Sequence, residues 1–150
     1  MRLWHKDLIP YLPQKQLVAQ WRELCCIAKN IAIDGTPNHL LVNKVLEYPI
    51  MNIYKYIDLV RDEMIKRGYN VTKESYIHCL MNLKQGQHNF FSGIRVGNYL
   101  FDDWMCDRYL IQCYYNLQEK FDCGGLTDEE WKRINDFVIS EIGISHGGVK

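Results

Sequence analysis

Glu23 is the residue whose type and spacing first suggest chemistry. Five apolar residues share one face of a predicted helix, and they are Leu17, Trp21, Leu24, Ala28 and Ile31. Glu23 lies roughly 120° away from that face, at about 100° per residue. Ala19 lies one turn before Glu23 on the same side, and Arg22 precedes it. A carboxylate beside a small residue can be reached by a ligand; the alternative is a solvated surface glutamate.

Four short motifs follow one another in the first half of the chain. They are Met1-Arg-Leu-Trp4, Leu17-x-x-x-Trp-Arg-Glu23, Gly35-Thr-Pro-Asn-His39 and Lys66-Arg-Gly-Tyr69. In this order they resemble the pyrimidine-dimer DNA glycosylase family of the phage endonuclease V type. The resemblance covers residues 1–71, and residues 72–150 carry no clear match.

The resemblance implies a DNA repair glycosylase with abasic-site lyase activity on pyrimidine-dimer or other damaged double-stranded DNA. In that family an N-terminal α-amine attacks the anomeric carbon of the sugar, expels the base and leaves an imine. The glutamate of the aromatic-Arg-Glu motif, here Glu23, is the catalytic acid. The mechanism needs neither a metal nor another cofactor.

A free α-amine suits this reaction because its ordinary pKa is ~7.7–8.0, far below the ~10.4 of lysine. The phage enzyme loses its initiator methionine and uses the small residue behind it. Here Arg2 follows Met1, and a large second residue normally protects the methionine from removal. We therefore expect the amine of Met1 itself, after deformylation, to act with Glu23.

Chain length permits the terminus to reach Glu23. The carboxylate lies about ten residues into the predicted helix, which is ~15 Å along it. A lead-in of about twelve residues can span ~40 Å when extended. We expect the terminus to fold back against the helix.

Four basic residues are the candidates for contacts with DNA. Arg22 matches the family arginine beside the glutamate, His39 matches the histidine after the first helix, and Arg2 accompanies them at the phosphates. A second basic residue expected one turn after Glu23 is missing, and Lys29 is its candidate substitute. The alternatives are a surface arginine for Arg22 and a locally hydrogen-bonded histidine for His39.

The charge pattern predicts modest DNA affinity. The formal net charge is zero, although nucleic-acid-binding proteins usually carry a basic surface. The opening segment is nevertheless basic, since two acidic residues, Asp7 and Glu23, accompany five basic ones: Arg2, Lys6, Lys15, Arg22 and Lys29. A basic face near the start of the chain is expected, with binding that is sensitive to salt.

Length and composition are typical of a globular protein. The 150 residues suit a single domain spanning 1–150, and no run approaches the ~20 apolar residues of a membrane span. We expect a cytoplasmic protein with buried, reduced cysteines and no metal site. The oligomeric state stays open. Two other functions also stay open: a non-catalytic nucleic-acid- or protein-binding module on the same scaffold, and a glycosylase for a different modified base.

The periodicity predicts an all-α fold, a compact helical bundle with an irregular N-terminal segment, Met1 to Leu12, packed on the first long helix. Proline, glycine and capping residues set the expected boundaries. Residues 85–101 are expected to form a loop or a weak hairpin, and residues 143–150 a frayed tail. The expected helices span residues 13–33, 39–47, 49–67, 72–84 and 102–121, with a last one capped by Thr127.

Overall fold

Every regular element in the described part of the chain is a helix, which confirms the all-α prediction. The computed structural model describes residues 1–94, 97 and 100–143, and the predicted frayed tail beyond residue 143 lies outside them. In chain order the elements are the 3-10 helix η1 (Lys6–Tyr11), α1 (Gln14–Asp34), the 3-10 helix η2 (Val42–Glu47), α2 (Met51–Lys66), α3 (Lys73–Gln85), the 3-10 helix η3 (Gln87–Asn89), α4 (Asp107–Asp122) and α5 (Asp128–Ile142).

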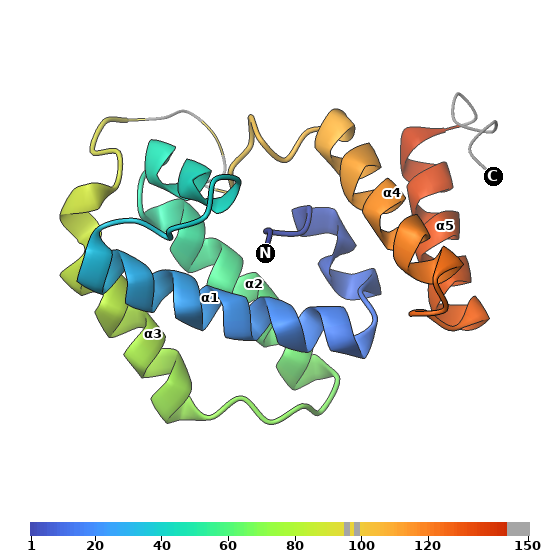
Figure 1. Ribbon diagram of the computed structural model, residues 1–150, viewed down its shortest axis with the longest axis horizontal. Coiled ribbons are helices and arrows are strands. Elements are labelled where there is room, and N and C mark those ends of the chain that lie inside the picture. The colour runs from blue at the N-terminus through green and yellow to red at the C-terminus, as the bar shows by residue number, and fades with distance from the viewer. Residues whose placement is uncertain (95–96, 98–99, 144–150) are drawn as a thin grey trace.

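The helices form two groups that the N-terminal segment joins. Helix α1 packs against both α2 and α3, while α4 packs against α5 (Figure 1). The short helix η1 contacts α2 on one side and α5 on the other. The first residue therefore lies in the middle of the molecule, between the two groups (Figure 1).

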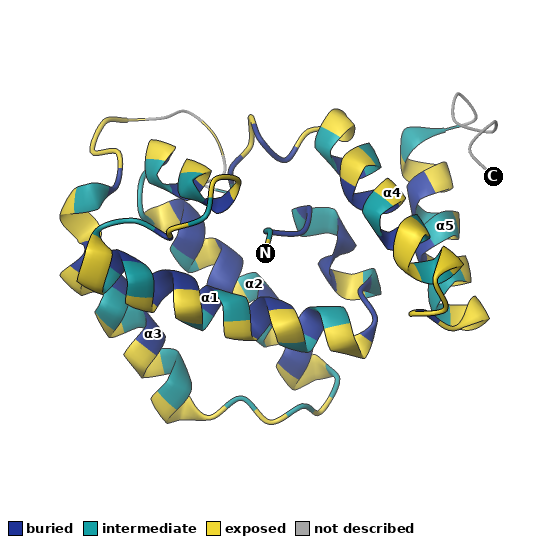
Figure 2. Cartoon of the chain, in the orientation of Figure 1, coloured by how far each residue is buried: buried dark blue, intermediate teal, exposed yellow. Residues whose placement is uncertain are grey.

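Helix α1 has the boundaries and the buried face that the sequence predicts. It follows Pro13 and ends at Gly35, which has a left-handed φ of 78° and donates its N–H to the Ile31 carbonyl. The apolar face lies within the dark blue, buried side of the ribbon in Figure 2. All five residues of the predicted stripe are buried: Leu17, Trp21, Leu24, Ala28 and Ile31.

The N-terminal segment packs on α1 as predicted, but it is more regular than expected. Lys6 to Tyr11 form η1, so the prediction of an irregular lead-in was wrong over these residues. His5 supplies the reason, because its side-chain Nδ1 accepts the Asp7 N–H at 3.1 Å and caps the turn. His5 is 2% exposed, and this burial lowers the pKa of its imidazole below the ordinary value.

The predicted start of the fourth long helix was wrong. Asp102 and Asp103 look like capping residues, yet α4 begins at Asp107. The intervening residues turn because Phe101 adopts a φ of 56° and donates its N–H to Asn52 Oδ1 at 2.8 Å. This anchor sends Trp104, which is 9% exposed, into the core before the helix begins.

Three other boundaries can be compared with the sequence. The helix expected over residues 39–47 begins only at Val42 and is a 3-10 helix. The capping box at Thr127 is confirmed, since its side chain accepts the Glu130 N–H at 3.1 Å. The segment 85–101 contains η3 and no strand among its described residues; residues 95, 96, 98 and 99 lie outside them.

The cysteines are less buried than predicted. Cys79 and Cys113 are buried, but Cys26, Cys106 and Cys123 are exposed. No group of three His, Cys, Asp or Glu side chains in the described residues is arranged to hold a metal ion. Among the same residues, no helix is both long enough and apolar enough to cross a membrane.

Candidate active site

Gln20 fixes the first residues of the chain against α1. Its side chain is fully buried, and its Oε1 accepts the Trp4 N–H at 2.8 Å. Its Nε2 donates to the Arg2 carbonyl at 3.0 Å. One amide side chain therefore satisfies a backbone donor and a backbone acceptor two residues apart, which sets the path of the segment.

Two tyrosines hold the same segment from the other side. The Tyr56 hydroxyl lies 2.6 Å from the Trp4 carbonyl oxygen and 2.9 Å from Gln20 Oε1, and its one proton is shared between these two acceptors. The Tyr109 hydroxyl donates to the Leu3 carbonyl. Burial raises the pKa of both phenols above the ordinary value, so both are protonated donors at neutral pH. Helices α1, α2 and α4 thus all bind the backbone of residues 2–4.

Glu23 lies one turn after Gln20 on the rim of the buried face. Its side chain is half-buried, and Gln20 Nε2 lies 3.4 Å from its Oε2. The residue that holds the N-terminal segment therefore also orients the carboxylate. Ala19, one turn before Glu23, leaves its flank open, as the sequence indicates.

Met1 and Glu23 line one cavity of about 570 Å³, called here the Glu23 cavity. Its size falls within the ~300–1,000 Å³ usual for ligand sites. Arg2 and His39 line the same cavity, so four of the six predicted site residues meet there. The remaining lining residues are Trp4, Lys15, Gln16, Ala19, Leu41, Asn116 and Lys120.

Two residues that line the Glu23 cavity each carry a buried polar atom without a hydrogen-bond partner. Gln16 Oε1 and His39 Nδ1 are both shielded from solvent, and neither bonds to a described residue. Unsatisfied buried polar groups are rare in native proteins and call for an explanation. Both residues line the Glu23 cavity, although these two atoms are themselves shielded from solvent.

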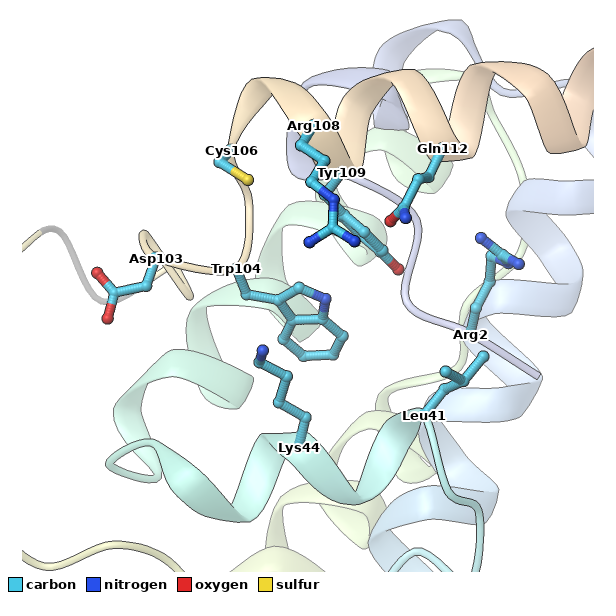
Figure 3. A pocket seen from close by; sticks show the side chains of 9 residues that line it. All are labelled: Arg2, Leu41, Lys44, Asp103, Trp104, Cys106, Arg108, Tyr109 and Gln112. Carbon is cyan, nitrogen blue, oxygen red and sulfur yellow. The ribbon is translucent and has the colours of Figure 1, made fainter.

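A second cavity of about 520 Å³ adjoins the first, and it is called here the Trp104 cavity. Arg2 and Leu41 line both cavities. Figure 3 shows Arg108, Tyr109 and Gln112 projecting from α4 above the Trp104 indole, with Lys44 from η2 below it. The Lys44 ammonium lies 5.8 Å from the centre of the indole ring, within cation–π distance.

The two cavities form a cationic face on a chain without net charge. Only two carboxylates, Glu23 and Asp103, line them. The lysine and arginine side chains of the two linings are Arg2, Lys15, Lys44, Arg108 and Lys120. The formal net charge of the whole chain is zero, so the positive charge is concentrated here. The basic face expected near the start of the chain therefore draws also on η2 and α4.

Arg22 and Lys29 do not join this cluster. Both are exposed on α1, and neither lines the Glu23 cavity or the Trp104 cavity. Arg22 precedes Glu23 but points to another face of the helix, because adjacent residues are about 100° apart. Their predicted contacts with DNA would have to lie beyond the edge of the two cavities.

Sequence reasoning missed several residues of the site. Gln20 had a signal, since it is a polar residue one turn from Leu17 and Leu24 on an otherwise apolar face. Asn116 and Lys120 carried no such signal in the sequence, because α4 reaches the cavity only through tertiary packing. Lys15 was counted as a basic residue but not as a cavity residue, and its place on the Glu23 side of α1 was readable from the helical period.

Comparison with known proteins agrees with the resemblance in the sequence. The family model described as pyrimidine dimer DNA glycosylase matches residues 1–77, just over half of the 150-residue chain. The match includes the N-terminal segment, α1 and η2, and so most of the Glu23 cavity. No curated protein and no solved structure matches the chain.

Proposed function

The chain belongs to the pyrimidine dimer DNA glycosylase family, and we propose that it excises damaged bases through an N-terminal imine and then cleaves the abasic strand. The observation that carries this proposal is the shared cavity of Met1 and Glu23. A primary amine and a carboxylate in one ligand-sized cavity are the two groups that the reaction needs.

In the first step the Met1 amine is the nucleophile. Its nitrogen lone pair attacks the anomeric carbon of the damaged nucleotide, and the glycosidic electron pair leaves with the base, which takes up the proton that the attacking nitrogen releases. Glu23, in its acid form, gives a proton to the sugar as the ring bond from carbon to ring oxygen opens. The product is an imine between the terminal nitrogen and the open sugar, with water as the only further reactant needed for release.

In the second step the Glu23 carboxylate acts as a base. It removes a proton from the sugar carbon next to the imine, and the electrons of that bond expel the 3′ phosphate. The cationic imine serves as the electron sink. The same carboxylate handles protons in both steps, which is consistent with its half-buried position and its contact with Gln20.

Phosphate contacts are assigned to the cationic face. Arg2 and His39 line the Glu23 cavity beside the reacting groups, and Lys15 and Lys120 flank them. These side chains supply sequence-independent affinity for the DNA backbone. Because a DNA duplex is wider than the cavity, Arg22 and, further along α1, Lys29 extend the phosphate contacts beyond it.

An extruded nucleotide has room in the neighbouring Trp104 cavity. Enzymes that act on a base in a duplex must take a nucleotide out of the stack and hold it against aromatic and polar side chains. Trp104 and Tyr109 provide the aromatic surface, and Gln112 provides an amide. Because Arg2 lines both cavities, one arginine lies between the reacting sugar and the displaced nucleotide.

The test is borohydride trapping on a duplex that contains an abasic site. Wild-type protein should form a covalent adduct, and Glu23→Gln should lower strand cleavage by about 10²–10⁴-fold without unfolding the protein. Glu141→Gln is the matched control, because Glu141 is exposed at the end of α5 and lines neither cavity. Equal cleavage by both variants would refute the role of Glu23.

Two further measurements separate the alternatives. Comparing pyrimidine-dimer, abasic and undamaged duplexes distinguishes this activity from that of a glycosylase for another modified base. Binding to DNA without any adduct on any substrate would instead indicate a non-catalytic module. Mass spectrometry of active protein should find a free amine on Met1, and a formylated or otherwise blocked terminus would contradict the mechanism.

A further inference from the structure

Two adjacent leucines, Leu40 and Leu41, project from the surface at the edge of the two cavities. Leu40 is 90% exposed and Leu41 is 56% exposed, although leucine is usually buried. They occupy the turn between the loop after α1 and the start of η2. Single exposed apolar residues need no explanation, but a projecting pair at the edge of a candidate active site calls for one.

Hydrogen bonds fix the loop that carries the leucines. Asn43 Oδ1 accepts the Thr36 hydroxyl at 3.0 Å and the His39 N–H at 3.2 Å. The Asn38 amide donates to Asp34 Oδ2 at 2.8 Å, which stabilises the left-handed φ of 60° at Asn38. The side chain of Asn30 donates to the Pro37 carbonyl at 3.2 Å. The exposure of the leucines is thus a property of a well-bonded turn.

Leu41 also lies at the junction of the two cavities, and Leu40 precedes it in the chain. Leu41 lines both of them, and its preceding neighbours in the chain are Leu40 and His39, which lines the Glu23 cavity. Figure 3 shows Leu41 and Arg2 at the same end of the Trp104 cavity. An apolar projection here would reach the space between a sugar in one cavity and a base in the other.

We propose that Leu40 and Leu41 form a wedge that enters the base stack of duplex DNA beside the damaged nucleotide and holds the stack open. This inference rests on the proposed function of the Glu23 cavity and adds to it a residue pair that positions the substrate. Apolar side chains inserted between base steps unstack and kink DNA in other proteins.

Charge complementarity selects DNA as the occupant of this surface. The two cavities that Leu41 lines carry five basic side chains and two carboxylates, so a polyanion is favoured over an acid-poor protein surface. The wedge also explains how a chain of zero net charge could hold DNA, because apolar insertion adds affinity that does not depend on net charge.

The wedge is tested by fluorescence of 2-aminopurine placed next to a non-cleavable tetrahydrofuran abasic analogue in a duplex. Wild-type protein should raise the fluorescence, because the probe brightens when it is unstacked. The double variant Leu40→Ala, Leu41→Ala should lose most of that rise. Its affinity should fall by about 10–100-fold, the effect of losing the burial of about one leucine side chain. Leu40→Met should retain both properties, since it keeps an apolar tip.

Two controls separate insertion from a general loss of binding. Met81→Ala removes another exposed apolar residue, 63% exposed on α3, that lines neither cavity, and it should behave as wild type. In a second duplex the bases opposite and beside the analogue are left unpaired, so the stack there is already disrupted and offers no intact base step in which the wedge can be buried. The affinity of the double variant for that duplex should fall by less than about threefold.

The possible results distinguish a failure of the proposed wedge from a failure of the proposed imine mechanism. An unchanged fluorescence rise in the double variant, or an equal loss of affinity on both duplexes, would overturn the wedge while wild-type trapping still supported the proposed function. Wild-type protein that unstacks the probe but forms no trapped adduct would support the wedge and overturn the imine mechanism. Wild-type protein without affinity for either duplex would overturn both.

Discussion

Replacing Gln20 with methionine tests whether Gln20 positions the N-terminal segment so that the terminal amine can act with Glu23. Methionine has a similar shape and volume, so Gln20→Met should leave little cavity or strain. The change removes the acceptor for the Trp4 N–H at 2.8 Å and the donor to the Arg2 carbonyl at 3.0 Å. Tyr56 keeps a partner, because its hydroxyl also donates to the Trp4 carbonyl at 2.6 Å.

The expected loss of stability follows from the two backbone groups left without partners. Each unsatisfied buried donor or acceptor costs about 1–3 kcal/mol, which gives about 2–6 kcal/mol for the pair. The Arg2 carbonyl is only partly buried and can recruit water, so the lower part of that range, about 2–4 kcal/mol, is the prediction. Urea denaturation followed by tryptophan fluorescence measures it.

The effect on chemistry should be larger than the effect on folding. At a temperature where Gln20→Met is still folded, a terminus that is no longer tied down samples many positions. Misplacement of a reacting group by about 1 Å can cost about 10²-fold in rate, and we predict a loss of that order in borohydride trapping. The exposed Gln85, which makes one hydrogen bond of 3.5 Å, supplies the control Gln85→Met.

The result that would refute this reasoning is a folded Gln20→Met protein that traps abasic DNA at the wild-type rate. In that case the four hydrogen bonds around Gln20 would stabilise the fold without positioning the amine. A control variant with the same loss of rate would contradict the reasoning equally, since it would tie the effect to methionine itself.

Three other predictions follow from the structure. Burial lowers the pKa of His5, so in acid the unfolded chain binds more protons than the folded chain. The free energy of unfolding should therefore decrease as the pH is lowered past about 6.5. His5→Asn keeps a capping acceptor and should lose this part of the acid dependence, measured by urea titrations at about pH 5 and pH 7. Thr127→Ala removes one half of the capping box and should cost about 1 kcal/mol of stability by the same titration, with trapping unchanged; a loss of trapping would show that α5 affects the site. Lys15→Ala and Lys120→Ala should each weaken binding to all duplexes alike and reduce the salt slope of the binding constant by about 1, and an unchanged slope would exclude the phosphate contact.

The sequence predicted the fold well where one periodic signal acted alone. The stripe from Leu17 to Ile31 and the stop at Gly35 determine α1, and the structure confirms both. The prediction was wrong where tertiary contacts override local preference. Asp102 and Asp103 resemble the start of a helix, but the hydrogen bond from Phe101 to Asn52, 49 residues earlier, delays α4 until Asp107.

About half of the candidate site could be predicted from the sequence. The family resemblance implied a terminal amine near Glu23, chain length and helical geometry permitted it, and Met1 and Glu23 line one cavity in the structure. The other wall comes from α4, whose Asn116 and Lys120 lie far along the chain and carry no local mark of their role. The part of the site that depends on packing between the two helix groups therefore became visible only in three dimensions.

The measurement that tests the central claim most directly is the position of the covalent link in the trapped adduct. The Glu23 cavity offers three amines, those of Met1, Lys15 and Lys120. Digestion of the borohydride-reduced adduct and mass spectrometry of the peptides should find the sugar on the α-nitrogen of Met1. A sugar on the side chain of Lys15 or Lys120 would contradict the account, because the terminal amine would then not be the nucleophile.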